Sequence, residues 1–499
     1  MSAPRAVIFD LYGTLLSTTS PVFRREISRL DPGARRAWAG FERDTLLVTP
    51  FPSHEAFVDA ILARFGRGDD QAFRDRALGL LHEELDSVHL LPGAIALLGF
   101  LKRRGIRLGL LTNSASPYRE PLERTGLAPL FDAVLFSCDE RARKPEPALY
   151  REACSRLGVE PGSTLMVGDS LVNDVVAPCE AGLSAILVGQ SRRTLSVARI
   201  GELGFWAWDE AGTPQPLLAI GQPLELAGRS GDLVSFEPLE ATEQGRYNLV
   251  ARGTAKFDEA MSTVYFKRFL HPESAEVERF VHELLPEFGI ESTEVAVLAG
   301  REPLLVSTAA QGEKLSPAGH GIHRTMAREI GRHFACGYLL SNADLRPRNA
   351  FLCETAAGPR LVMVDHEYCL LNLALDLDDV PDRYDRRRLE ALGETELRRR
   401  IVRRVLTPQT MRRARRAFLD LPAEAPDLAA GFREGWVEVH ATAQRNARRI
   451  RQRIADRLAQ PPDLIVGTHA YRRALTTLDL EELMARIAGD PEASCAPCL

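Results

Sequence analysis

Apolar positions near the N-terminus form a short, unbroken run, which then gives way to a helical pattern. Residues 6–10 read AVIFD, and a β-branched run of this length that ends in an acid predicts a buried strand. From about 16 to 92, apolar residues recur every three to four positions, as in EAFVDAILARF and DQAFRDRALGLLHEEL. That spacing predicts amphipathic helices inserted directly after the first strand.

Strand and helix patterns then alternate. GIRLGLLTN, FDAVLFS, STLMVGDS and SAILVG have the composition of buried strands, while PYREPLERTGL and PALYREACSRLGV have helical spacing. Such alternation predicts βαβ units and a Rossmann-like parallel sheet with helices on both faces, so the first fold class is α/β. The helical segment 16–92 would then lie above this sheet as a cap.

The pattern fails between about 205 and 230, where glycine and proline are frequent. After this stretch, alternating runs predict strands over 232–270 and near 294–307, with helices at 274–288 and 320–340. The remainder from 386 is mostly helical. A chain of 499 residues is too long for one ordinary core. We therefore predict an α/β domain over 1–204, a linker over 205–230 and an α+β domain over 231–499 with a helical C-terminal region.

Composition and charge indicate the cellular compartment of the protein. The formal net charge is −5, and no apolar run approaches the ~20 residues that a membrane helix needs. The N-terminal residues lack the layout of a secretory signal, and eight scattered cysteines suit a reducing compartment. We expect a cytoplasmic protein without a membrane partner. Cys495 and Cys498 form a lone Cys-x-x-Cys, which we interpret as part of a frayed tail.

Five polar residues follow the predicted strands of the first domain. Asp10 and Thr112 each close a strand, Lys144 lies in RKPEP, and Asp169 and Asp174 lie in VGDSLVND. Ligands of open α/β sheets bind outside the carboxyl ends of the strands, so these side chains should converge. A carboxylate nucleophile can form an acyl-phosphate, while a hydroxyl and an ammonium hold the phosphoryl oxygens. The further acids complete an oxygen-ligand site for Mg²⁺.

The pieces DLYGTLL, LLTNS, RKPEP and GDSLVND resemble, in this order, the motifs of the haloacid dehalogenase superfamily. The resemblance covers nearly all of residues 5–195, and the inserted helices are similar to the small helical cap of one branch. It implies a hydrolase acting on a phosphorylated small molecule that the cap selects. The residues it implies are the nucleophile Asp10, the phosphoryl-binding Thr112 and Lys144, and the Mg²⁺ ligands Asp10, Asp169, Asp174 and the backbone carbonyl of Tyr12.

Tyr12 departs from the phosphatase pattern of this superfamily. Phosphatases usually have a second acid two residues after the nucleophile, and this general acid contributes ~10²–10⁴-fold to the rate. Tyrosine at this position resembles the metal-independent 2-haloacid dehalogenases, whereas the paired acids of GDSLVND resemble the metal-binding phosphatases. A slow phosphatase is the first interpretation. The alternatives are a 2-haloacid dehalogenase and a catalytically inert module that regulates or scaffolds the second domain.

A second group of polar residues lies in the C-terminal half. Asp344 and Asn349 lie in SNADLRPRNAFLC, Asp365 follows an apolar strand, and Lys267 lies within another apolar strand. A lysine in a buried strand is costly without an acidic partner. Glu278 is our choice for that partner, although two other glutamates of the same predicted helix remain candidates, Glu276 and Glu283.

This arrangement resembles the atypical kinases: aminoglycoside-type phosphotransferases, phosphoinositide kinases and bacterial persistence-toxin kinases. The resemblance covers about 232–380 and implies an ATP-dependent phosphotransferase. In it, Asp344 would position the acceptor hydroxyl, Asn349 and Asp365 would hold Mg²⁺, and Lys267 would meet the nucleotide phosphates beside Glu278. The glycine-rich G-x-G-x-x-G is absent before Lys267, and DHE replaces Asp-Phe-Gly. With both domains active, the protein would be bifunctional.

The segment from Arg386 to Arg416 contains twelve arginines, and a further group lies in RNARRIRQRIADR. The favoured interpretation is a set of solvated helix faces. The alternative is an anionic acceptor, such as a nucleic acid or a phosphorylated metabolite, bound by arginine side chains.

Overall fold

A computed structural model describes the chain over residues 4–27, 35–191, 193–208, 214–239, 248–270, 272, 274–310, 312–316, 323–342, 345–355, 358–366, 369, 408–419, 425–459 and 480–499. The chain divides into two compact units. Unit 1 comprises Met1–Ala219 and Glu237–Ala251, and unit 2 comprises Ile220–Phe236 and Arg252–Leu499. The residues predicted as a linker, 205–230, contain short strands, and the predicted domain boundaries stay a prediction.

Unit 1 is built on a six-stranded sheet with the order β5-β4-β1-β6-β7-β8. Every neighbouring pair in this sheet is parallel. The predicted parallel α/β sheet is therefore confirmed, and β1 lies in its middle. The strands are β1 (Ala6–Phe9), β4 (Arg107–Thr112), β5 (Ala133–Phe136), β6 (Thr164–Gly168), β7 (Ser184–Val188) and β8 (Ser196–Val197).

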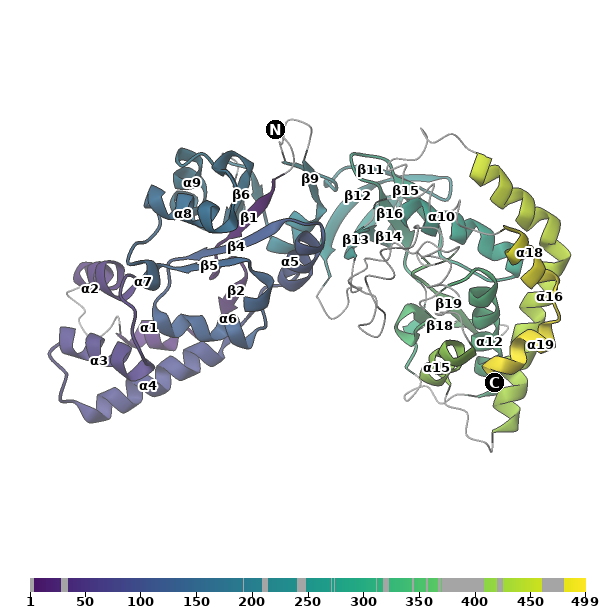
Figure 1. Cartoon of the computed structure of the whole chain (residues 1–499), viewed down its shortest axis with the longest axis horizontal. Coiled ribbons are helices and arrows are strands. Elements are labelled where there is room, and N and C mark those ends of the chain that lie inside the picture. Colours follow the sequence, from purple (N-terminus) through teal and green to yellow (C-terminus); the bar gives the residue numbers. More distant parts are fainter. Residues whose placement is uncertain are drawn as a thin grey trace. The chain divides into compact units, whose positions relative to one another are not determined.

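Helices cover both faces of this sheet because its strands are apolar on both faces (Figure 1). Val7 and Phe9 of β1 pack in the cluster that contains α5, whereas Ala6 and Ile8 pack in the cluster that contains α8. The alternation of side chains along a strand sends neighbouring residues to opposite layers. The elements of this part are α5 (Ala94–Arg103), α6 (Glu120–Arg124), α7 (Ser137–Glu140), α8 (Pro147–Leu157), α9 (Ala177–Glu180), β9 (Trp206–Trp208) and β10 (Pro214–Pro216).

The segment between β1 and β4 forms a helical cap. It leaves and re-enters the sheet domain through an antiparallel pair of short strands, β2 and β3. Its own apolar cluster includes Phe23, Phe57, Ile61 and Leu81, so the helices pack on one another. The cap elements are β2 (Leu16–Thr18), α1 (Val22–Ile27), α2 (Arg35–Phe41), the π-helical turn η1 (Glu42–Leu46), α3 (His54–Arg64), α4 (Gln71–Asp86) and β3 (Val88–Leu90).

Unit 2 combines a β-rich part with a helical part. Its larger sheet has the order β11-β12-β13-β14-β16-β15, and a smaller one has the order β17-β18-β19. The strands are β11 (Pro223–Leu226), β12 (Arg229–Pro238), β13 (Leu249–Phe257), β14 (Ala260–Arg268), β15 (Val295–Leu298), β16 (Leu304–Thr308), β17 (Glu313–Lys314), β18 (Ala350–Thr355) and β19 (Gly358–Met363). The helices are α10 (Ser274–Leu284), α12 (Arg324–Leu339), α15 (Pro408–Phe418), α16 (Pro426–Ala459), α18 (Leu480–Ala488) and α19 (Pro491–Cys495).

Two long helices of unit 2, α12 and α16, meet at glycines. A Cβ atom at Gly331 would overlap the carbonyl oxygen of Phe432, and one at Gly435 would overlap the carbonyl oxygen of Arg328. Backbone therefore lies against backbone, which lets apolar side chains such as Phe334 and Trp436 close the core around the crossing. This close approach leaves no room for any larger residue at these two positions.

The Cys-x-x-Cys segment differs from the sequence-based expectation. Cys495 and Cys498 are buried and belong to the main apolar cluster of unit 2, so the interpretation as a frayed tail is wrong. The indole of Trp436 donates a hydrogen bond to Ser494 at 3.0 Å, which ties this segment to α16. Among the described residues, we find no helix with the length and hydropathy needed to cross a membrane.

We expect Gly435→Ala to lower the free energy of unfolding of unit 2 by about 2–3 kcal/mol, because the added methyl group forces α12 and α16 apart. Urea unfolding of the full chain measures this change. The matched control is Gly79→Ala on α4, where a Cβ atom would meet nothing within 4 Å. That substitution should stabilise its helix by up to ~1 kcal/mol. An unchanged unfolding midpoint for Gly435→Ala would contradict the packing described above.

Candidate functional site

Three polar side chains lie at the carboxyl ends of adjacent strands in unit 1. Asp10 directly follows β1, Thr112 ends β4, and Asp169 directly follows β6. Because β4, β1 and β6 are neighbouring parallel strands, their carboxyl ends share one edge of the sheet. The residues predicted from strand ends therefore lie in one place.

Lys144 reaches this edge from the loop before α8. Its ammonium lies 2.7 Å from Asp10 Oδ1 and 2.6 Å from Asp174 Oδ1. Asn113 fixes the backbone of this loop, since its side chain accepts from Lys144 N at 2.8 Å and donates to Lys144 O at 2.9 Å. The lysine is thus held at both its backbone and its charged end.

Burial decides the electrostatics of this group. The side chains of Lys144 and Asp174 are 2% and 1% exposed, and Asp10 is 7% exposed. Burial raises the pKa of Asp10 to about 6, because Lys144 offsets only part of the desolvation and Asp174 adds repulsion. Burial alone would lower the pKa of Lys144, but the two carboxylates outweigh it and raise that pKa. The lysine therefore stays charged and compensates buried negative charge.

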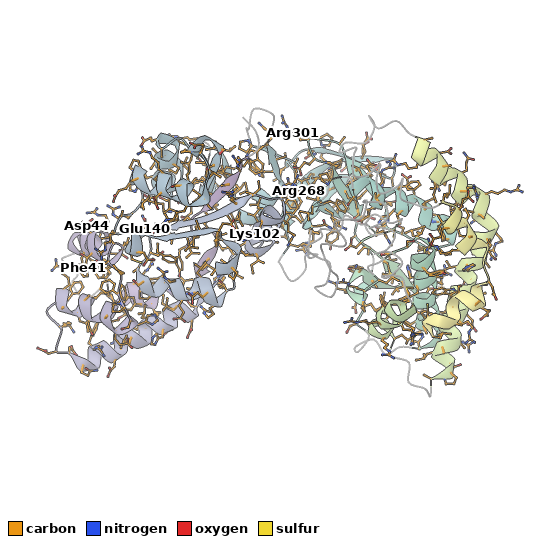
Figure 2. The ribbon with its side chains drawn as sticks, viewed as in Figure 1. Phe41, Asp44, Lys102, Glu140, Arg268 and Arg301 are labelled. Carbon is orange, nitrogen blue, oxygen red and sulfur yellow. The ribbon has the colours of Figure 1, made fainter. Side chains whose placement is uncertain are left out.

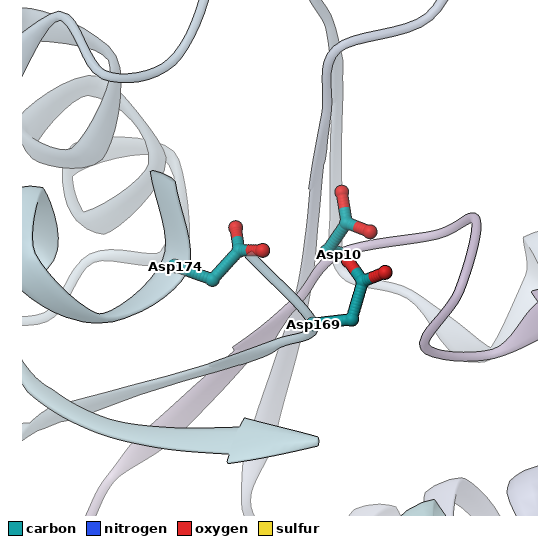
Figure 3. Close-up of side chains that lie close together, drawn as sticks. All are labelled: Asp10, Asp169 and Asp174. Atoms are coloured by element: carbon teal, nitrogen blue, oxygen red, sulfur yellow. The ribbon is translucent and has the colours of Figure 1, made fainter. Parts of the chain in front are cut away.

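Asp10, Asp169 and Asp174 form a cluster of hard oxygen donors (Figure 3). One carboxylate oxygen of each lies within 4.8 Å of the others. Gly13, with φ of +85°, makes room for this cluster, because a Cβ atom there would overlap the Asp169 carboxylate. Three carboxylates opposed by one ammonium leave an excess of negative charge, so the donor set fits a divalent cation such as Mg²⁺.

Asp174 is placed by an unusual turn. It lies on the π-helical turn η5 (Leu171–Val176), and the hydroxyl of Ser170 caps this turn by accepting from Asn173 N. Asp174 Oδ2 accepts from Ser170 N at 2.9 Å, and the Asp174 carboxylate lies in the same cluster as Asp169. Such single π turns are frequent at functional sites.

Tyr12 is turned away from the carboxylates. Its hydroxyl donates to the backbone carbonyl of Tyr118 at 2.9 Å, and the two rings meet edge to face at 5.7 Å between centroids. The phenol is therefore engaged elsewhere in the fold. The metal contact through the Tyr12 carbonyl stays a prediction.

A second group of charged residues lies in unit 2. Lys267 on β14 places its ammonium 2.8 Å from Glu278 Oε2 on α10 and 2.6 Å from Asp365 Oδ1 after β19. Burial alone would raise the pKa of Glu278, but Lys267 and His282 hold it well below its ordinary value. Of the three candidate partners, Glu278 contacts the lysine, whereas Glu276 and Glu283 pair with Arg279.

Of the other residues predicted for this group, the structure describes Asn349 and Asp365. Asn349 is buried at the end of η8 (Pro347–Asn349), and its carbonyl accepts from the backbone N–H of Val364 at 2.8 Å. Asp365 follows directly and has φ of 73°, a left-handed conformation that costs energy for a residue other than glycine. Strained backbone of the kind seen at Asp365 is concentrated at functional sites. Asp344 lies outside the described residues.

Arginines of the C-terminal region form ion pairs within unit 2. Arg457 of α16 contacts Glu276 at 3.0 Å, and Arg453 and Arg449 contact Glu287 at 3.4 and 3.3 Å. These pairs hold α16 against α10 and η7 (Leu285–Phe288). Residues 386–407 lie outside the described residues, so binding of a nucleic acid or another anionic acceptor stays a prediction.

Sequence reasoning missed two residues that lie next to members of the first site. Asn113 is adjacent to Thr112 within LLTNS, so its position in that motif could have revealed it. Arg143 precedes Lys144 and lies 4.0 Å from Asp44, a cap residue labelled in Figure 2. Its contact joins distant segments, and we find no local sequence signal for it.

We expect Lys144→Met to lower the free energy of unfolding by about 3 kcal/mol at pH 8, because it leaves buried carboxylates unpaired. The loss should be smaller at pH 5. Without the ammonium, the folded-state pKa of Asp10 rises further above its ordinary value. A carboxyl with a raised folded pKa favours the folded state at low pH and loses that contribution as the pH rises.

Urea unfolding with a metal chelator at both pH values measures this effect. Lys102→Met is the matched control, since Lys102 (Figure 2) pairs with Asp132 at 3.3 Å and is 39% exposed. An exposed pair contributes less than about 1 kcal/mol. Equal losses for the two variants would contradict the assignment of Lys144 as a buried charge partner.

Comparison with known proteins places unit 1 in a family. A model of haloacid dehalogenase-like hydrolases matches residues 4–182. The phosphoglycolate phosphatase of Rhodospirillum rubrum is 37% identical over 233 residues, covering 43% of this chain and 93% of that protein. The pyrophosphatase PpaX of Bacillus velezensis is 34% identical over 191 residues, covering 36% and 79%. The N-acylneuraminate-9-phosphatase of Homo sapiens is 40% identical over 84 residues, covering 17% and 34%. The chain aligns with 93% of the phosphoglycolate phosphatase, and the matched region contains the Asp10 site. The chain therefore belongs to the haloacid dehalogenase-like hydrolases.

Proposed function

We propose that the Asp10 site is a phosphatase that hydrolyses phosphate monoesters of small molecules. The observation that carries this proposal is the buried Asp10 carboxylate, held 2.7 Å from the Lys144 ammonium within a cluster of three carboxylates. The relatives described above are phosphatases, which points to the same chemistry.

Asp10 acts as the nucleophile in this proposal. An oxygen of its carboxylate attacks the phosphorus, the bond to the leaving alcohol breaks, and an aspartyl-phosphate forms. Water then attacks the phosphorus of this intermediate, which releases inorganic phosphate and restores the carboxylate. Lys144 and the Thr112 hydroxyl, which lies 2.9 Å from Ser114 Oγ, hold the phosphoryl oxygens during both steps. Asp10, Asp169 and Asp174 would hold Mg²⁺, which supplies neutralisation of the phosphoryl charge when bound.

Proton supply to the leaving group is the weak part of this site. The Tyr12 hydroxyl already donates to the Tyr118 carbonyl, and burial raises its pKa above the ordinary value of a phenol, which makes it a poorer acid. We therefore expect slow turnover of alkyl phosphates and faster turnover of esters whose leaving group departs unprotonated. A 2-haloacid dehalogenase is the alternative, because that chemistry also starts from an aspartate nucleophile. The Asp169 carboxylate beside Asp10 favours the metal-dependent phosphatase instead.

We expect the full chain to hydrolyse p-nitrophenyl phosphate with Mg²⁺, and Asp10→Asn to lower kcat by about 10³-fold or more, because the amide cannot form the acyl-phosphate. Release of p-nitrophenol measures this rate. Asp59→Asn, which alters an exposed carboxylate paired with Arg74 on the cap, is the control and should retain full activity. Chloride release from 2-chloropropionate without metal, in place of phosphate ester hydrolysis, would overturn the proposal in favour of a dehalogenase.

We also propose that unit 2 is an ATP-dependent phosphotransferase. The contact of Lys267 with Glu278 and Asp365 supports it, because a lysine held by a helix glutamate is positioned to meet nucleotide phosphates. Asn349 and Asp365 would hold Mg²⁺, and Asp344 would position the acceptor hydroxyl. A catalytically inert phosphate-sensing or scaffolding unit is the alternative, and the absence of a glycine-rich loop favours it.

We expect ATP with Mg²⁺ to raise the melting temperature of the full chain, since a ligand at ~100 times its Kd stabilises the folded state by ~2.7 kcal/mol. Lys267→Met and Asp365→Asn should each abolish this shift, which differential scanning fluorimetry measures. Lys256→Met is the control, because Lys256 is exposed and pairs with Glu259. A melting temperature that ATP leaves unchanged in the unaltered protein would refute the proposal for unit 2.

A further inference from the structure

Tyr118 connects the sheet domain to the cap of unit 1. It lies in η2 (Ser116–Arg119), after β4, and is 4% exposed. Its hydroxyl donates to Glu84 Oε1 on α4 at 2.7 Å. Glu84 is 1% exposed, so this bond satisfies a carboxylate that water hardly reaches.

A second cap helix converges on the same residue. The backbone N–H of Arg24 on α1 donates to Glu84 Oε2 at 3.1 Å, and the Arg24 Nε donates to the Tyr118 hydroxyl at 3.3 Å. The guanidinium of Arg24 lies 4.6 Å from the centroid of the Tyr118 ring. Moving the cap away from Tyr118 would break the bond between Glu84 and the Tyr118 hydroxyl, whereas the contacts of Glu84 with Arg24 lie within the cap and would remain.

The backbone of Tyr118 contacts Tyr12, a residue of the loop that follows the nucleophile. Its carbonyl accepts the hydrogen bond from the Tyr12 hydroxyl, and the rings of Tyr12 and Tyr118 are in edge-to-face contact. Tyr12 is two residues beyond Asp10. A continuous path of contacts therefore runs from the cap helices through Glu84, Tyr118 and Tyr12 to the loop that carries the nucleophile.

We propose that Tyr118 is a positioning residue for the reaction at Asp10, which couples closure of the cap to the geometry of the nucleophile loop. This inference rests on the proposed phosphatase function. With the cap closed, Glu84 holds the Tyr118 side chain, and the Tyr118 carbonyl holds Tyr12. When the cap opens to admit substrate or release product, the bond to Glu84 breaks and this support of the loop weakens. Asp10 then has its reactive geometry in the closed state, where water is excluded.

Tyr118→Phe tests this coupling, because it removes the hydroxyl but keeps the ring and the carbonyl that Tyr12 uses. In the full chain with p-nitrophenyl phosphate and Mg²⁺, we expect kcat to fall about 10-fold and KM to change less than about 3-fold, since a displaced nucleophile slows chemistry more than binding. Hydrogen exchange should also become faster at the Arg24 amide and in residues 10–15.

Ser116→Ala is the matched control. Its hydroxyl accepts from the Phe51 backbone at 2.9 Å, which is another bond between sheet domain and cap but one without a link to Tyr12. It should keep kcat within about 2-fold of the unaltered protein. An unchanged kcat in Tyr118→Phe, or an equal loss in Ser116→Ala, would overturn the proposal.

The exchange measurement separates this proposal from the phosphatase function. If the unaltered chain hydrolyses no phosphate ester, the phosphatase function fails, and exchange in residues 10–15 alone decides the coupling. Faster exchange there in Tyr118→Phe would support a link between cap and nucleophile loop, and unchanged exchange would refute it.

Discussion

A lysine ammonium between two carboxylates is the interaction on which both units depend for their charged sites. In unit 1, Lys144 lies between Asp10 and Asp174, and in unit 2, Lys267 lies between Glu278 and Asp365. An isolated charge is expensive to bury, so each member of these groups is tolerated because the others are present. Each group joins segments that are distant in sequence, and its residues can therefore assemble only when the fold around them is complete.

The two groups differ in the amount of carboxylate charge that the lysine does not neutralise. In unit 1, Asp169 adds a third carboxylate at the same edge, whereas the described carboxylates that contact Lys267 are two. A surplus of oxygen donors suits a divalent cation together with an incoming phosphoryl group. Among the described residues, the group in unit 2 is closer to charge balance, with one ammonium between two carboxylates.

The sheet edge of unit 1 was predictable because β-strand ends can be recognised from local sequence. Asp10, Thr112 and Asp169 each follow an apolar run, and parallel pairing puts such positions side by side. Lys267 was predictable because a lysine within an apolar strand requires an acid nearby. The choice of Glu278 over Glu276 and Glu283 depended on which helix face meets the sheet, which spacing alone does not determine.

Contacts across long sequence separations were not predictable. Tyr12 and Tyr118 are 106 residues apart, and Tyr118 and Glu84 are 34 apart, so neither pair leaves a local pattern. Cys498 was wrongly predicted to lie in a frayed tail. Its burial depends on how the helices of unit 2 pack together, and the local sequence around it does not reveal that packing.

The glycine crossing of α12 and α16 also governs the order in which unit 2 can mature. Gly331 on α12 needs the backbone around Phe432 as its neighbour, and that backbone is synthesised about a hundred residues later. The sheet of unit 1, by contrast, has its last strand at Val197, so its core can close early in translation. Until α16 arrives, α12 exposes an apolar face that has no permanent partner. During synthesis, this apolar face of α12 therefore waits longer for its partner than the core of unit 1 does.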